Sequence, residues 1–197
     1  MKKNVKKIIL SPIMQDVTAT RKITYIAIMT ALQVICNMFF EIKLAETQYS
    51  LTIFFSVFTG MIIGPFFGFV ACFLGDLVGF LYNSAGFAYM PWIGLAMGTT
   101  ALISGLIMNG IRERKEYTKY IKLLVVCVLV FLICTIAINT TAFWVLYAKG
   151  VPYFTYVISR VFVMGQIWNS LLNYGLLFIC YPIMQAIITQ LQKRRKG

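Results

Sequence analysis

The sequence predicts an all-α membrane protein in which six transmembrane helices form one compact bundle and both termini are cytoplasmic. Three observations predict this class: the composition is strongly apolar, the apolar residues fall into six segments, and the basic residues cluster between them. Of the 197 residues, 60% are hydrophobic and 12% are charged, and the mean hydropathy is +0.82. Soluble globular domains do not approach such a composition.

The apolar segments have the lengths that a bilayer requires, about 17 to 25 residues each. A basic N-terminal segment, 1–22, precedes them and is interpreted as cytoplasmic, because polar residues and a proline interrupt its short apolar run. The membrane domain is predicted to cover 23–191, and a basic cytoplasmic tail, 192–197, ends the chain. The six helices are predicted at 23–40, 50–64, 66–82, 92–110, 120–147 and 157–190.

The basic residues predict the orientation. Three clusters hold six, five and four of them, 15 of the 18 Lys and Arg residues: one before the first helix, one between the fourth and fifth, and one at the C-terminus. With six spans all three clusters fall on one side of the membrane, which the positive-inside rule makes the cytoplasmic side. An odd number of spans would separate the first cluster from the last.

Several classes of function are excluded by what the sequence lacks. There is no histidine, and the five cysteines are dispersed in apolar stretches without CxxC spacing, so we expect no metal, no cofactor and no disulfide framework, and cysteines that serve as packing residues. The basic residues flank apolar segments, which predicts contact with membrane lipid and not with nucleic acid. No Walker motif is present, so the chain itself is not expected to hydrolyse ATP.

Polar side chains inside the apolar segments and aromatic side chains near their ends are the candidates for ligand binding. Intramembrane polar groups usually face a cavity, a partner or each other. The simpler interpretation of each amide is an interhelical hydrogen bond worth about 0.6 to 2 kcal/mol. Taken together they predict a hydrogen-bonding pocket with aromatic walls that opens to the outer face. The predicted contacts are Asn37, Lys43, Asp76, Tyr89, Trp92, Asn139, Trp144, Arg160, Gln166 and Asn169.

Asp76 is the one acid clearly within a predicted span, in the stretch "GDLVGFLYNSAGFAYMPW". Three roles stay open for it at this stage. The carboxylate could bind a donor on a ligand, form an ion pair with Arg160 or Lys43, or cap a break in the backbone. The pliable segment that follows, with its aromatic residues, is interpreted as a lid over a flat ligand.

The order of several motifs resembles a known family. "AIMTA" in the first helix, "GPFFGFVACFLGDLVGF", and then "AGFAYMPW" and "GLIMN" resemble the S component, the substrate-binding subunit, of energy-coupling factor (ECF) transporters, and most closely the folate-family S components. The resemblance implies a subunit in a prokaryotic plasma membrane that binds a vitamin or related micronutrient at the outer face. It also implies a transmembrane T component and two ATPase subunits as partners, with Ala27 and Ala31 as the docking face for the T component.

The sequence departs from the folate-binding pattern at Asn37, where those members carry an arginine. Without that cation, the carboxylates of a folate would need Lys43 or Arg160, and a pterin-like or purine-like ring or another vitamin fits the amides equally well. Two other classes are weighed against this function. One is a secondary transporter driven by an ion gradient, which would take up solute alone, and the other is a membrane enzyme or an assembly scaffold.

Overall fold

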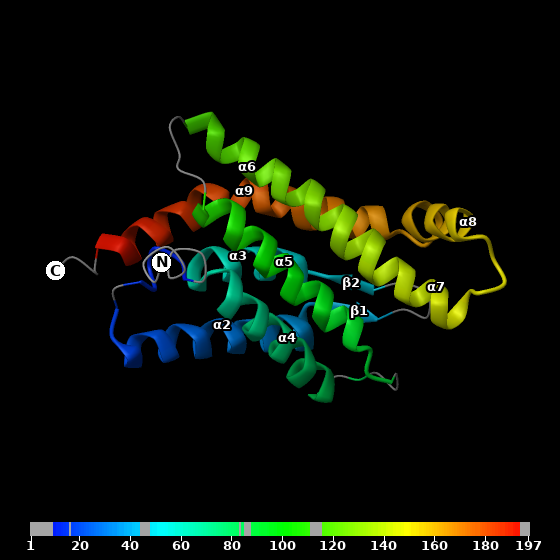
Figure 1. The fold of residues 1–197 in the computed structure, drawn as a ribbon, viewed down its shortest axis with the longest axis horizontal. Helices are drawn as coiled ribbons and strands as arrows, with labels where there is room; N and C mark the ends of the chain where they lie inside the picture. The colour runs from blue at the N-terminus through cyan, green and yellow to red at the C-terminus, as the bar shows by residue number, and fades with distance from the viewer. Residues whose placement is uncertain are drawn as a thin grey trace, which may run out of the picture.

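A computed structural model describes residues 10–15, 17–43, 48–82, 84, 88–110 and 116–193 of the chain, without the side chains of 41–43, 48 and 116. The helices lie along one long axis, side by side (Figure 1). The elements, in chain order, are α2 (Ala19–Phe39), β1 (Glu41–Lys43), β2 (Gln48–Ser50), α3 (Thr52–Ile63), α4 (Pro65–Tyr82), α5 (Pro91–Gly110), α6 (Glu116–Val130), η1 (Phe131–Thr140), α7 (Thr141–Tyr147), α8 (Tyr153–Ile158), η2 (Ser159–Val163) and α9 (Gln166–Lys193).

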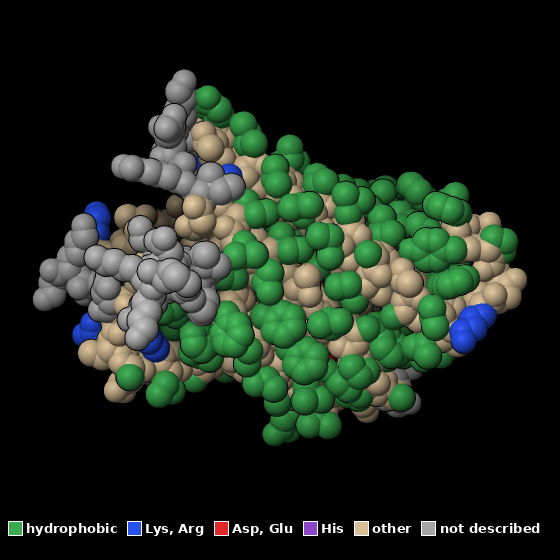
Figure 2. Space-filling view, viewed as in Figure 1, with side chains coloured by type: hydrophobic (Ala, Val, Ile, Leu, Met, Phe, Trp, Pro, Cys, Tyr) green, Lys and Arg blue, Asp and Glu red, His purple; other side chains and the backbone are tan. Residues whose placement is uncertain are grey.

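The helices have the lengths and compositions of membrane spans. Within the described residues, five helical stretches are long and apolar enough to cross a bilayer, α2, α4, α5, the continuous run 117–147 and α9, while α3 and the stretch 153–163 are shorter. Large apolar side chains such as Leu124, Val128 and Leu132, four residues apart on one face, are about half exposed. Such side chains cover the middle of the molecule, and blue Lys and Arg side chains lie toward its ends (Figure 2). The predicted class, an all-α membrane protein, is confirmed.

The sequence "GPFFG" contains the turn that separates α3 from α4. Gly64 has φ of 95°, a conformation that favours glycine, and Pro65 begins α4, where a missing N–H leaves no helical hydrogen bond unmade. A Cβ on Gly105 of α5 would lie 2.6 Å from the Pro65 nitrogen. The turn and α5 therefore pack backbone against backbone.

The small residues of α4 let α2 approach as closely. A Cβ on Gly75 would lie 2.7 Å from the Cβ of Gln33, and one on Gly79 would lie 2.7 Å from the Cβ of Asn37. Glycines four residues apart on one face of α4 therefore let α2 pack closely against it.

The segment between α2 and α3 departs from the prediction of a helix-only chain. Strands β1 and β2 pair antiparallel, with Ile42 opposite Tyr49. Asn173 of α9 donates from Nδ2 to the Ser50 carbonyl at 2.6 Å and accepts at Oδ1 from the Phe54 N–H at 3.0 Å. The second bond satisfies a backbone N–H in the first turn of α3 that the helix cannot pair itself, and the first holds the end of β2. A side chain distant in sequence therefore fixes the end of the hairpin.

The prediction of one helix at 157–190 is wrong, because the chain breaks at Gly165. This residue has φ of +78°, which a continuous helix cannot contain. α8 and η2 precede the break, and α9 follows it and extends to Lys193. The fifth predicted span, 120–147, is found at 116–147, but its middle section, η1, is π-helical. In this section the Thr140 hydroxyl donates to the carbonyl of Thr135, five residues earlier, at 2.8 Å.

The described part of the N-terminal segment packs onto the bundle. Ser11 donates from Oγ to the Ile62 carbonyl, and Ile13 and Met14 are fully buried in a cluster with Leu191 of α9. α2 begins at Ala19, before the predicted boundary at 23, and residues 1–9 and 194–197, which include most of the predicted tail, lie outside the described residues.

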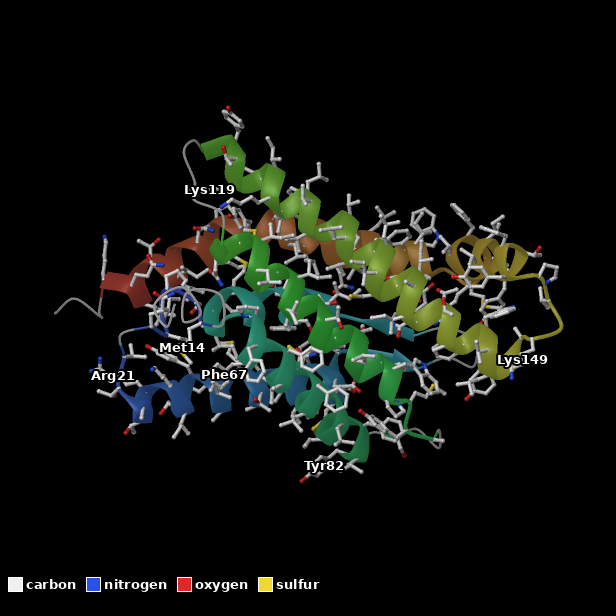
Figure 3. All side chains as sticks on the ribbon, viewed as in Figure 1. Met14, Arg21, Phe67, Tyr82, Lys119 and Lys149 are labelled. Atoms are coloured by element: carbon white, nitrogen blue, oxygen red, sulfur yellow. The ribbon has the colours of Figure 1, made fainter. Side chains whose placement is uncertain are left out.

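Both described ends of the chain therefore lie at the same end of the bundle (Figure 1). Arg21 and Lys119 lie toward this end, and Lys149 lies at the opposite end (Figure 3). We call the first the terminal end and the second the far end.

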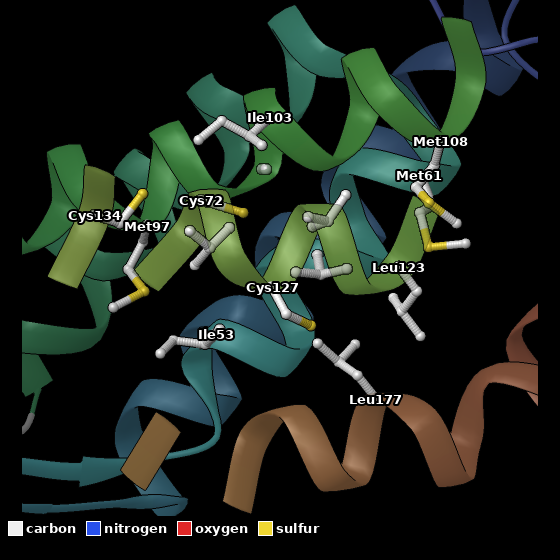
Figure 4. Close-up of a cluster of buried hydrophobic side chains, with 14 of the residues drawn as sticks. Ile53, Met61, Cys72, Met97, Ile103, Met108, Leu123, Cys127, Cys134 and Leu177 are labelled. Atoms are coloured by element: carbon white, nitrogen blue, oxygen red, sulfur yellow. The ribbon is translucent and has the colours of Figure 1, made fainter. Parts of the chain in front are cut away.

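The main core lies between α3, α5, α6 and α9 (Figure 4). Met61, Met108, Leu123 and Leu177 meet there, together with Cys127. The cysteines are free thiols and four of the five are buried. No cluster of metal-ligating side chains occurs in the described part of the chain.

Candidate functional site

One pocket is lined by two side chains that hold buried polar atoms without a hydrogen-bond partner, Asn139 and Arg160. It lies where the hairpin, α3, α5, η1, α7, η2 and α9 converge. The space open to the centres of water molecules is about 40 Å³, room for a few waters, since one water needs about 10 to 15 Å³ on this measure. The lining residues are Ser50, Ile53, Ile93, Ala96, Met97, Thr100, Cys134, Thr135, Asn139, Phe143, Arg160, Gln166 and Asn169.

Each element contributes one face to this pocket. From α5 the residues are spaced three or four apart, as one side of a helix requires. Thr135, Asn139 and Phe143 follow each other at intervals of four along η1 and α7. Gln166 and Asn169 belong to the first turn of α9, directly after the Gly165 break. The break thus lets η2 and the start of α9 present polar side chains to the same cavity.

Arg160 is the one charged side chain among the lining residues described. It is 8% exposed, and its guanidinium carbon lies 4.0 Å from the centroid of the Phe143 ring, within the range of a cation–π interaction. Its Nε is buried and has no hydrogen-bond partner. A buried guanidinium is costly unless its donors are used.

Other buried polar atoms around the pocket also lack partners among the described residues. Asn139 Oδ1 is one of them, and it lines the cavity. Trp92 Nε1 is another, and its ring packs edge-on against Phe143 with centroids 6.0 Å apart. Leaving such a group unsatisfied costs about 1 to 3 kcal/mol. The site therefore holds both an unused donor and an unused acceptor, and a bound molecule could use both.

Four of the ten residues predicted from the sequence line this pocket: Asn139, Arg160, Gln166 and Asn169. Asn169 is already partly used, because its Oδ1 accepts the backbone N–H of Ser50 at 3.1 Å. The amide thus links α9 to the hairpin as well as lining the cavity.

Three predicted residues lie together elsewhere. Asn37 donates from Nδ2 to Asp76 Oδ1 at 2.8 Å, and the Tyr89 hydroxyl donates to Asp76 Oδ2 at 3.4 Å. None of the three lines the pocket. Burial and then the negative charge of Asp76 raise the pKa of Tyr89 to about 12, so its hydroxyl keeps its proton near neutral pH. The contacts described for Asp76 are thus hydrogen bonds from side chains of α2 and of the connection before α5, a role that differs from the three left open by the sequence.

The remaining predicted residues are placed separately. Trp144 donates from Nε1 to the Val151 carbonyl at 2.8 Å and packs against the Tyr153 ring at 5.4 Å, which holds the turn between α7 and α8. Trp92 lies beside the pocket through its contact with Phe143. The side chain of Lys43 lies outside the part of the chain that the structure describes.

The sequence-based prediction missed Phe143 and Thr135, which line the pocket. Their spacing of four from Asn139 was the signal that could have found them, because residues four apart share a helix face. It also missed Met97 and Thr100 of α5, which carry no signal beyond their place in an apolar helix.

The predicted docking residues lie on an uncovered face of α2. Ala27 and Ala31 are both exposed, and Ile28 and Ile35 beside them are 53% and 47% exposed. Small side chains there would allow another helix to approach closely.

Comparison with known proteins gives a consistent result. The family model of the ECF-type riboflavin transporter S component matches residues 17–188. Among solved structures, the crystal structure of FolT bound with folic acid is similar in fold, with a TM-score of 0.61 and 19% sequence identity over 89% of this chain and 94% of that chain. No curated protein sequence matches. The resemblance predicted from the motifs is confirmed, and this multi-pass membrane chain belongs to the family of ECF-type riboflavin transporter S components.

Proposed function

We propose that the chain captures a vitamin with a flat heteroaromatic ring in the pocket at Asn139 and Arg160, and delivers it through an ATPase-driven partner complex. The observation that carries the proposal is the pair of buried, unpartnered polar atoms in that pocket, Asn139 Oδ1 and Arg160 Nε. Proteins rarely leave such groups unsatisfied, and a ligand that completes both would gain free energy at each.

The chemistry of the two atoms defines the ligand. Arg160 Nε–H needs an acceptor, such as a ring carbonyl oxygen or a carboxylate, and Asn139 Oδ1 needs a donor, such as a ring N–H. The flavin ring of riboflavin and the pterin ring of folate both carry a carbonyl beside an N–H. Riboflavin is favoured by the family model that matches, and folate by the ligand of the similar FolT structure.

Binding would require the pocket to widen. Pockets for drug-sized ligands have volumes of about 300 to 1,000 Å³, whereas this cavity has room for only a few waters. The walls at Gly165 and at the π-helical segments η1 and η2 lack regular α-helical hydrogen bonding. We infer that these walls move when the ligand enters, as in induced fit.

The proposal also includes the orientation of the chain in the membrane and the subunits with which it assembles. Both described ends of the chain lie at one end of the bundle, and Arg21, Lys22, Lys122 and Lys193 lie near it, so the positive-inside rule favours a cytoplasmic terminal end in a cell membrane. The pocket would then open at the outer face. A T component would dock on α2 at Ala27 and Ala31, and two ATPase subunits would supply the energy, because the chain carries no ATP-binding motif of its own.

The experiment that tests this function is a titration of the purified subunit with riboflavin and, in parallel, with folate. Riboflavin is fluorescent, so binding is followed directly, and mass spectrometry identifies any small molecule that remains bound after gentle purification. We expect one of the two vitamins to bind the subunit alone, while vesicles accumulate it only when the partner subunits and ATP are present. Accumulation by the chain alone against a gradient would contradict the proposal and indicate a secondary transporter.

A further inference from the structure

Asp76 of α4 joins α2 to the connection before α5. It lies beside a face of α5 that does not line the pocket. Its two carboxylate oxygens accept hydrogen bonds from Asn37 of α2, at 2.8 Å, and from Tyr89 in the connection before α5, at 3.4 Å. Both Asp76 and Asn37 are buried. The Tyr89 ring also packs against Phe80 of α4, with centroids 5.2 Å apart.

The carboxylate also lies against the first turns of α5. A Cβ on Gly94 would lie 2.9 Å from Asp76 Oδ2 and 3.0 Å from the Tyr89 hydroxyl, so the absence of a side chain at position 94 makes this approach possible. A negative charge near the start of a helix interacts favourably with the helix dipole. Asp76 therefore stabilises the start of α5 as well as the connection before it.

This start of α5 is also a wall of the pocket. Ile93 lines the cavity, and Trp92 packs against Phe143, another lining residue. Asp76 thus holds one face of the segment 89–94, and another face of the same segment forms part of the ligand site. A change in how Asp76 holds the segment would move the wall.

We propose that Asp76 is a positioning residue, which fixes the connection before α5 to α2 and so keeps the pocket wall at Trp92 and Ile93 closed over a bound ligand. The proposal rests on the proposed function for its effect on binding. Its effect on the connection itself is independent of any ligand. Because α2 also carries Ala27 and Ala31, the same contact joins the ligand site to the helix on which the T component would dock.

The first test measures the connection in the ligand-free protein. Met90 is half-buried beside Tyr89, and Ala148 is half-buried in the connection between α7 and α8, so Met90→Cys and Ala148→Cys are matched reporters for labelling with a membrane-impermeant maleimide. Hydrogen bonds to charged groups are worth more than a factor of ten in an equilibrium constant. We expect Asp76→Asn to raise the labelling rate at position 90 about tenfold and to leave the rate at position 148 unchanged.

The second test separates the charge from the hydrogen bond. In the double variant Asn37→Asp with Asp76→Asn, the two side chains can still bond to each other, but the carboxylate moves to α2, away from Tyr89 and Gly94. We expect this exchange to restore thermal stability but not slow labelling at position 90. Restored slow labelling, or an unchanged rate in Asp76→Asn, would overturn the proposal. Should Asp76→Asn fail to fold, Tyr89→Phe removes one hydroxyl only and is expected to accelerate labelling at position 90 about threefold.

The third test measures release of riboflavin and of folate. For whichever vitamin binds the original protein, Asp76→Asn should raise the dissociation rate about tenfold and change the association rate less than twofold, since affinity changes at one site appear mainly in dissociation. An unchanged dissociation rate would refute the link between the connection and the pocket. If neither vitamin binds the original protein, the proposed function is wrong, while the labelling rates still decide whether Asp76 fixes the connection.

Discussion

Replacing Arg160 with methionine is expected to weaken ligand binding without weakening the fold. Methionine reaches about as far as the Arg160 Nε, so the aliphatic part of the side chain is kept, while the guanidinium and its contact with the Phe143 ring are lost. Its hydrogen bond to a carbonyl or carboxylate of the ligand is charge-assisted and worth about 1.5 to 3 kcal/mol. The affinity for riboflavin or folate should therefore fall roughly 10- to 150-fold.

The free energy of unfolding of the ligand-free protein is expected to rise slightly in this variant or to stay nearly the same. The buried Nε of Arg160 has no partner, which costs about 1 to 3 kcal/mol, and its contact with Phe143 returns about 0.5 to 2 kcal/mol. These terms nearly cancel, so removing both should shift the free energy of unfolding by no more than about 1 kcal/mol. Binding sites commonly carry such unfavourable groups, which the ligand then satisfies.

The assay is a fluorescence or calorimetric titration beside a thermal denaturation curve of the same preparation. Lys149→Met is the matched control, because it removes a positive charge at the far end of the bundle from an exposed position and should alter neither affinity nor stability. A large loss of thermal stability in Arg160→Met with unchanged affinity would refute the reasoning, since it would make Arg160 a structural residue.

Three further predictions concern other elements. Gly165→Ala should destabilise the protein by about 1 kcal/mol or more in a thermal denaturation curve, because residue 165 has φ of +78° and a Cβ there would meet the Tyr49 hydroxyl. Asn173→Ala should cost about 1 to 3 kcal/mol in the same measurement, since the Ser50 carbonyl loses a 2.6 Å bond; a loss below 0.5 kcal/mol would contradict this. Ala27→Trp should abolish vitamin uptake by the assembled transporter while the isolated subunit binds the vitamin normally, and unaffected uptake would exclude docking at this face.

Much of the fold follows from the sequence because a bilayer imposes strong constraints. Backbone groups in lipid must be paired within the chain, so long apolar segments form helices, and the predicted spans agree with α2, α4 and α5 to within a few residues at most ends. The Gly64 and Pro65 turn was also predictable, since these residues cannot continue a helix without cost. The hairpin was not, because its three-residue strands are too short to produce a recognisable alternation.

The break at Gly165 shows why the last predicted helix was too long. The segments on both sides of Gly165 are mainly apolar, and glycine is common inside membrane helices. Only tertiary contact distinguishes a glycine that packs from one that ends a helix. Here Tyr49 of β2 occupies the space where a side chain at 165 would lie, and its ring comes from more than a hundred residues earlier in the chain.

The candidate site was predicted in part, and the division among the polar residues has a physical reason. From the sequence, Asn37, Asp76, Asn139 and Arg160 look alike, since each is a polar group in an apolar helix. In the structure Asn37 donates to Asp76, although its Oδ1 has no partner, whereas the unpartnered Asn139 Oδ1 and Arg160 Nε belong to residues that line a cavity. Pairing depends on which helices are neighbours, and periodicity within one helix cannot supply that information.

Unpartnered atoms occur away from the pocket as well, on Gln33 and Asn37, so only an unpartnered atom that also borders the cavity separates a candidate ligand-binding residue from a structural one. Asn173 and Asn139 are both amides on helices that border the same region, but Asn173 bonds to backbone groups at Ser50 and Phe54, and one atom of Asn139 bonds to nothing described. The first arrangement fixes the hairpin over the pocket, and the second leaves free energy for a ligand to recover. If this reasoning holds, alanine at 173 lowers stability more than intrinsic affinity, and alanine at 139 lowers affinity while leaving stability nearly unchanged.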